Sequence, residues 1–213
     1  MMVSRKSRDI RKDFTMKTKN KLLDFADTLC NFIVLNIVFL ISCLPIFTIG
    51  AAITSLYYVM MKESRGEYGY FIKPYLSAFK SNFIKSTKLF LLLTILFFVF
   101  SFNMIFWLSI KSIIGNIIAI LFIIALTLIC GISLYCYPLL SQFENTIGQT
   151  IKNALGLCCS NLKASGLLLI ITLFTFFLGY FSSPLRILIL LFGFVFTVYV
   201  KSFILNKIFS NYY

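Results

Sequence analysis

The stretch Cys43-Leu44-Pro45-Ile46-Phe47-Thr48-Ile49-Gly50 lies in the middle of an apolar run that extends from Thr28 to Met61 without a charged side chain. This run is too long for one membrane crossing of about 20 residues and barely long enough for two. Pro45 lacks a backbone N–H donor and Gly50 is conformationally free, so a second crossing would begin in this stretch. The threading of the run therefore decides the topology of the chain.

The composition is that of a membrane protein. Of the 213 residues, 60% are hydrophobic and only 13% are charged, whereas about 45–50% apolar and about 25% charged residues are usual in globular proteins. A soluble fold of this size could not cover its surface with so few charges. We therefore expect an all-α fold, a polytopic bundle of transmembrane helices with two amphipathic helices at the cytoplasmic interface. No signal peptide is evident, so the first apolar run should remain as an anchor.

The charges are unevenly distributed along the chain. Its 20 lysines and arginines face only seven acidic residues, and they concentrate in an N-terminal tail, 1–22, and in the segment 62–88. The positive-inside rule predicts that both basic segments are cytoplasmic, where they would attract anionic lipid headgroups. A basic protein can also bind nucleic acid, but in a chain this apolar we expect membrane lipids as partners and no nucleic acid.

Two cytoplasmic flanks require that the Thr28–Met61 run enters the membrane and returns. It is then a hairpin of two short arms that turn at Pro45 to Gly50. Arms of this length are marginal for a full crossing, so the second arm either spans the membrane or is re-entrant. With both termini cytoplasmic, the predicted single transmembrane domain, 23–208, has apolar segments at about 28–44, 46–61, 89–108, 113–137, 162–181 and 185–204, and interfacial helices at about 71–88 and 141–160.

Local patterns refine these segments. An aromatic residue recurs every fourth position in 71–88, as in an amphipathic helix. Ser141 and Glu144 fit the S-x-x-E capping box at the start of the second interfacial helix. Arg186 and Lys201 lie near the ends of the last apolar segment, where their long side chains can reach the headgroups.

The sequence offers little for catalysis or metal binding. It contains no histidine, none of its acidic residues lies inside a predicted span, and none of its six cysteines forms a C-x-x-C pair. General acid–base catalysis requires titratable groups that share a pocket, and an ion-coupled transporter usually places such a group at membrane depth. We therefore expect no enzymatic activity, no catalytic residue, no cofactor and no metal site.

Three motifs carry a family resemblance. They are Phe25-Ala26-Asp27 with Asn36 and Cys43-Leu44-Pro45-Ile46-Phe47-Thr48-Ile49-Gly50-Ala51-Ala52-Ile53-Thr54-Ser55-Leu56-Tyr57-Tyr58, then Tyr75-Leu76-Ser77-Ala78-Phe79-Lys80-Ser81-Asn82-Phe83, and Tyr137-Pro138-Leu139-Leu140-Ser141-Gln142-Phe143-Glu144-Asn145-Thr146. In these motifs the chain resembles the YesL-like family of bacterial membrane proteins. The resemblance implies a multi-pass protein of the bacterial cell membrane, of unknown function and often linked to carbohydrate uptake gene clusters. It supplies no catalytic residues.

Two functional hypotheses follow. The first is a non-catalytic accessory subunit that associates with the permease subunits of a carbohydrate ABC importer. The second is a small stand-alone transporter or channel, and a lipid-sensing regulatory role is a further alternative. Substrate, partner identity and oligomeric state stay open. The candidate interaction and hinge residues are Asp27, Asn36, Pro45, Thr48, Gly50, Thr54, Tyr57, Phe79, Asn82, Pro138, Glu144 and Asn145.

Overall fold

The fold is all-α, as the sequence predicts. The computed structural model describes residues 27–67, 69–181 and 183–211, and within these ranges it contains helices and no strand. The predicted basic tail, 1–22, lies outside the described residues. Four helices are long and apolar enough to cross a membrane, and they cover Ile72–Ser109, Ile113–Gln142, Leu162–Tyr180 and Arg186–Phe209.

The apolar run that opens the domain is broken at Pro45. The first described helix is Asp27–Cys43, and a short 3-10 helix, η1 (Ile46–Thr48), leads from Pro45 into α2 (Ile49–Ser64). The Thr48 hydroxyl donates to the carbonyl oxygens of Pro45, at 2.6 Å, and Ser42, at 2.5 Å, so the tight turn satisfies its own polar groups. Gly50 was expected in this turn but lies in the first turn of α2.

The next helix is longer than the sequence predicts. Instead of an interfacial helix at 71–88 followed by a span at 89–108, the structure has one unbroken helix, α3 (Ile72–Ser109). Beyond Pro74 this segment contains neither proline nor glycine, so nothing interrupts its backbone hydrogen bonds. Its 38 residues span about 57 Å, nearly twice the thickness of a hydrocarbon core.

The segment after α3 also departs from the prediction. α4 (Ile113–Gln142) continues through Pro138 instead of ending near residue 137, and α5 (Ile147–Ser160) begins later than the predicted 141–160. The capping box predicted at Ser141 and Glu144 is wrong. Ser141 donates to the Pro138 carbonyl at 2.7 Å, and the capping box of α5 is formed by Thr146 and Gln149.

The C-terminal part consists of two apolar helical segments. α6 (Leu162–Phe181) has the predicted bounds. The predicted span 185–204 is longer and interrupted, because α7 (Ser183–Leu188), a π-helical segment η2 (Ile189–Gly193) and α8 (Phe194–Phe209) follow one another. A π-helical turn holds more residues than an α-helical turn, so the side chains of α8 face other directions than an unbroken helix would give them.

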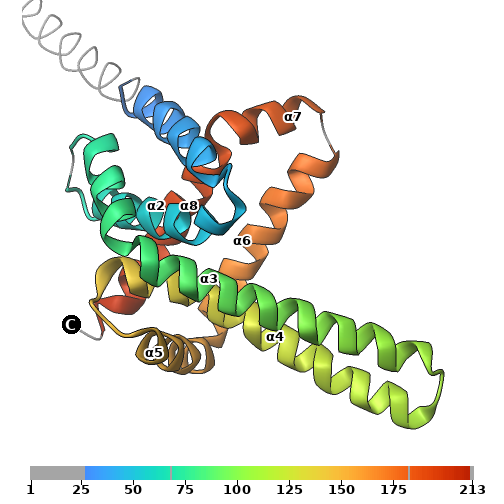
Figure 1. Ribbon diagram of the computed structural model, residues 1–213. Helices are drawn as coiled ribbons and strands as arrows, with labels where there is room; N and C mark the ends of the chain where they lie inside the picture. The colour runs from blue at the N-terminus through green and yellow to red at the C-terminus, as the bar shows by residue number, and fades with distance from the viewer. Residues whose placement is uncertain (1–26, 68, 182, 212–213) are drawn as a thin grey trace, which may run out of the picture.

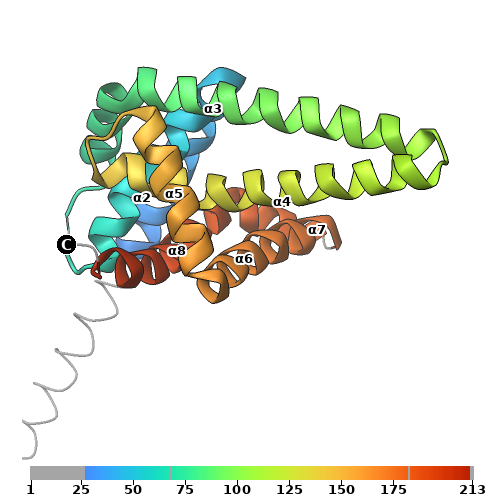
Figure 2. The same ribbon diagram turned by 90° about the horizontal axis from the view of Figure 1, so that it is seen from below.

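Figures 1 and 2 show how these helices are arranged. α3 and α4 run side by side and project together from the rest of the protein. α2 lies at the other end, where it packs against α3, α4 and α8. α6 leaves this end in a different direction, so that its far end is well separated from the α3–α4 pair (Figure 1).

Candidate functional site

At Gly50 and Thr54, in the first of the three sequence motifs, α2 packs closely against α3. A Cβ atom on Gly50 would lie 2.5 Å from the Ser86 carbonyl oxygen and 2.6 Å from the Phe90 Cβ, so only glycine fits there. One turn further along α2, the buried Thr54 hydroxyl accepts a 3.0 Å hydrogen bond from Ser86 and donates to the Gly50 carbonyl at 2.9 Å. Small and hydroxylated residues of this kind permit close helix packing in membranes.

Asn36 links the first helix to the interrupted C-terminal segment. Its side chain is fully buried. The amide Nδ2 donates to the Leu190 carbonyl at 2.7 Å, and Oδ1 accepts from the Val195 N–H at 3.1 Å. Leu190 lies within the π-helical segment and Val195 two residues after it, where the regular hydrogen-bonding pattern is lost, so one side chain satisfies both backbone groups.

Most other predicted site residues have local or packing roles. Tyr57 is buried in the core, and Asn82 donates to the Ala78 carbonyl one turn earlier. Phe79 lies between two aromatic rings of its own helix, stacked on Tyr75 and tilted against Phe83. Asp27 is exposed at the start of the first helix, and Pro138 is buried within α4. These positions do not converge on one site.

A polar junction ties together the ends of α2, α4 and α8. Nη1 of Arg65 donates to Gln142 at 3.1 Å and to Asn206 at 3.3 Å, while Asn206 donates to Ser64 at 2.6 Å. Nε of Arg65 forms a 2.8 Å ion pair with Glu67. The hydrogen bond from Arg65 and its positive charge hold the pKa of Glu67 below the ordinary value. Of these residues, Ser64, Arg65 and Glu67 follow the predicted hairpin arm 46–61, whereas Gln142 ends α4 and Asn206 lies in α8.

The sequence did not predict that two charged residues, Lys201 and Glu63, are buried. Lys201, expected to reach the headgroups, is only 6% exposed within α8. Glu63, at the end of α2, is also 6% exposed, and its Oε2 has no hydrogen-bond partner in the described part of the chain. Within the described ranges no ion pair involves either residue. Their sequence positions, at the edges of apolar segments, gave no signal of burial, because burial depends on how α2 and α8 pack.

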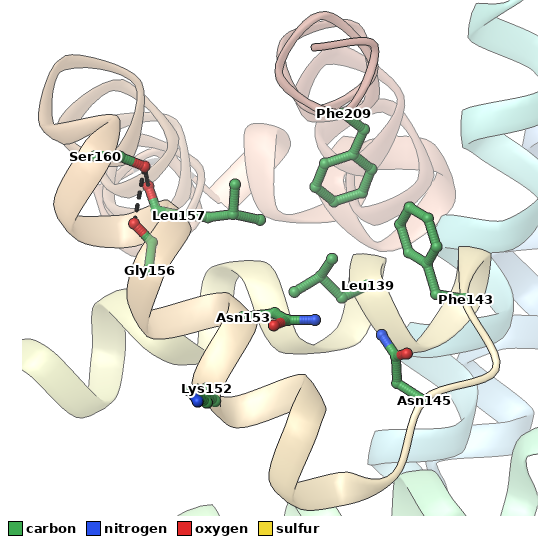
Figure 3. A pocket seen from close by; sticks show the side chains of 9 residues that line it. All are labelled: Leu139, Phe143, Asn145, Lys152, Asn153, Gly156, Leu157, Ser160 and Phe209. Carbon is green, nitrogen blue, oxygen red and sulfur yellow. Dashed lines mark hydrogen bonds between the residues drawn. The ribbon is translucent and has the colours of Figure 1, made fainter. Parts of the chain in front are cut away.

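A pocket of about 580 Å³ opens where α5 lies against the end of α4 and α8. We call it the interface pocket, and Figure 3 shows its lining. Leu139, Leu157, Phe143 and Phe209 form the apolar part of its wall. Asn145, Asn153, Lys152, Gly156 and Ser160 complete it. Of the predicted site residues, Asn145 alone lines this pocket, whereas the neighbouring Glu144 is exposed in the linker between α4 and α5.

A second hollow, of about 470 Å³, lies where α6 diverges from the α3–α4 pair. We call it the cleft. Its wall contains the small residues Thr127, Cys130, Ser133 and Thr172 among leucines, isoleucine and methionine. No charged residue lines it, and no group of three or more His, Cys, Asp or Glu that could hold a metal ion was found in the described part of the chain.

Together, the four apolar helices and the apolar surfaces between them define a multi-pass α-helical membrane protein. Residues 32–104 match the family model described as "Protein of unknown function, DUF624". The match covers about a third of the chain, from the first helix through α2 and most of α3. No curated protein and no solved structure matches the chain significantly.

Proposed function

We propose that this protein is a non-catalytic accessory subunit of the bacterial cell membrane that associates with a carbohydrate ABC importer. The observation that carries the proposal is the open cleft between α6 and the α3–α4 pair. The family match is consistent with the resemblance to YesL-like proteins, and that resemblance is our reason for naming a carbohydrate importer.

The walls of the cleft suit a transmembrane helix of a permease subunit. The hydroxyls of Thr127, Ser133 and Thr172 donate to carbonyls of their own helices at 2.7–2.9 Å. They are therefore satisfied without a ligand, and their small size allows another helix backbone to approach closely. A polar solute would find no free charged group among the lining residues.

Site-specific photo-cross-linking in native membranes tests this proposal. A photoreactive residue at Leu169, which lines the cleft, should form an adduct with an importer permease subunit. The matched control is Phe102 on α3, which is 71% exposed and does not line the cleft. Equal adducts from both positions would place the partner elsewhere, and the absence of permease adducts from both would refute the association.

A stand-alone transporter is the second candidate, and the buried Lys201 favours it. Lys201 is buried in α8 and has no ionic partner among the described residues. A cation held in this way between membrane helices is costly and often marks a substrate or ion path. Purified protein reconstituted alone should then support solute flux across liposomes, and Lys201→Met should abolish that flux. Liposomes that stay tight with the unaltered protein would exclude this function.

A further inference from the structure

We propose that the interface pocket binds a single anionic phospholipid, with its phosphate at the polar edge and an acyl chain over the apolar wall. This inference does not depend on association with an importer. It rests on the lining of the pocket, on the unpaired polar groups at its edge and on its position along α4.

The apolar wall is too extensive for a purely polar ligand. Leu139, Leu157 and Phe209 belong to the core formed with α2, α4 and α8, and the rings of Phe143 and Phe209 pack edge to face with centroids 5.8 Å apart. A ligand in the pocket would cover the outer surface of this core. Burying apolar area there is favourable for a hydrocarbon chain and offers nothing to inorganic phosphate.

The opposite edge presents hydrogen-bond donors without partners. The amides of Asn145 and Asn153 point toward one another across the pocket (Figure 3), yet neither makes a hydrogen bond with a described residue. Lys152, beside Asn153 on α5, is exposed and has no ion pair in the described chain. The Ser160 hydroxyl already donates to Gly156 at 2.8 Å.

These free groups match the chemistry of a phosphodiester. Two amide NH₂ groups and an ammonium group are donors, and charge-assisted bonds to phosphate oxygens are among the strong ones. None of the nine lining residues is acidic, so the wall of the pocket contains no carboxylate.

The position of the pocket along α4 favours a lipid over a soluble phosphate. Leu139 and Phe143, at the C-terminal end of α4, line the pocket. The turn that joins α3 and α4 lies at the other end of α4 (Figure 2). The 30 residues of α4 span about 45 Å, compared with about 30 Å for the hydrocarbon core. If that turn lies at one membrane surface, the pocket lies at headgroup level on the other, where α5 can rest along the interface.

Native mass spectrometry of the purified full-length protein tests the assignment. The probes are dioleoylphosphatidylglycerol, dioleoylphosphatidylcholine and glycerol 3-phosphate, which separate anionic lipid, zwitterionic lipid and soluble phosphate. We expect one tightly held phosphatidylglycerol, and about tenfold weaker retention in the double variant Lys152→Gln with Asn153→Leu, which corresponds to about 1.4 kcal/mol. Lys85→Gln removes an exposed lysine of α3 outside the pocket and should leave retention unchanged.

Each other outcome overturns the proposal. Equal retention by the unaltered protein and the double variant would exclude the pocket as the lipid site. Equal retention of both lipids would exclude recognition of the anionic headgroup, and tight binding of glycerol 3-phosphate alone would assign the pocket to a soluble phosphate. The single variant Lys152→Arg keeps the positive charge and should retain phosphatidylglycerol as tightly as the unaltered protein. Equal loss in Lys152→Arg and in the double variant would show that the charge is not recognised.

Discussion

Replacing Asn36 by leucine should weaken the contact between the first helix and the C-terminal segment. Leucine has a similar size but can neither donate to the Leu190 carbonyl nor accept from the Val195 N–H, which lie 2.7 and 3.1 Å from the Asn36 amide. Because Asn36 is fully buried, water cannot replace either hydrogen bond. Both backbone groups would then stay unpaired beside the π-helical turn.

The size of the effect follows from the two lost bonds. Hydrogen bonds between membrane helices contribute about 0.6 kcal/mol on average and at most about 1.7 kcal/mol each. For two bonds we expect the free energy of unfolding to fall by about 1–3 kcal/mol. The π-helical turn contains one residue more than an α-helical turn. If it changed into a regular α-helix, α8 would have to rotate by about 100° about its axis, so this change would be costly. That rotation would break the hydrogen bond between the hydroxyls of Thr175 and Thr197, whose oxygens lie 3.1 Å apart.

Reversible unfolding in mixed micelles, followed by circular dichroism, measures this change. Asn103→Leu is the matched control, because the one hydrogen bond of the Asn103 side chain among the described residues is to the Val99 carbonyl of its own helix, at 2.8 Å. The control should lose less than about 0.5 kcal/mol, in the range of ordinary surface substitutions. If Asn36→Leu and Asn103→Leu destabilise equally, or if Asn36→Leu is neutral, the bridge does not hold the two segments together and the reasoning is wrong.

Three shorter predictions concern the hairpin and its surroundings. Gly50→Ala should destabilise the fold by about 1–3 kcal/mol through overpacking against α3, whereas Gly166→Ala, with no atom within 4 Å of the added Cβ, should not, as thermal unfolding can show. Because Arg65 lowers the folded-state pKa of Glu67, this pair should stabilise the protein above pH 4.5 and lose its effect as the pH falls through the lowered pKa. The loss should stay below about 1 kcal/mol, since the Glu67 side chain is 52% exposed, and it should vanish in Glu67→Gln when melting is compared at pH 7 and pH 3. Single cysteines at Glu67 and Lys111 should react with impermeant reagents from opposite sides of the membrane, and labelling from the same side would contradict the topology.

The break at Pro45 and the bounds of α6 were predictable because their signals are local. Proline removes a donor within a uniform apolar run, and the α6 segment is bounded on both sides by polar residues. Charge counts also made the all-α membrane class clear. These signals need no knowledge of which helices touch.

The division of α3 was predicted wrongly because a change of polarity is not a helix end. Its first half is amphipathic and its second half is almost entirely apolar, so the pattern suggested two elements. Without a proline or glycine between them, the backbone has no reason to stop. The start of α5 was also predicted wrongly, because the sequence contains two candidate capping boxes. Ser141 precedes Glu144 by three residues, and Thr146 precedes Gln149 by three residues. The extended conformation of Phe143, with φ −126° and ψ 138°, separates them and leaves Thr146 as the cap.

The π-helical turn and its bond to Asn36 could not be derived from local sequence. The segment Ile189–Gly193 contains no proline, and the bonds join residues more than 150 positions apart. The sequence placed Asn36 among the candidate interaction and hinge residues without indicating a partner. Its actual partners are backbone groups, which one sequence cannot reveal.

The family match and the candidate binding surfaces fall in different parts of the chain. Asn36, Gly50, Thr54 and Ser86 lie within residues 32–104, and each either bonds to or packs against a neighbouring helix. The interface pocket lies wholly outside that range, and of the cleft residues only Met104 falls inside it. The matched segment therefore explains how the first three helices pack. A ligand or partner is therefore to be sought on α4, α5 and α6, whose side chains line the interface pocket and the cleft.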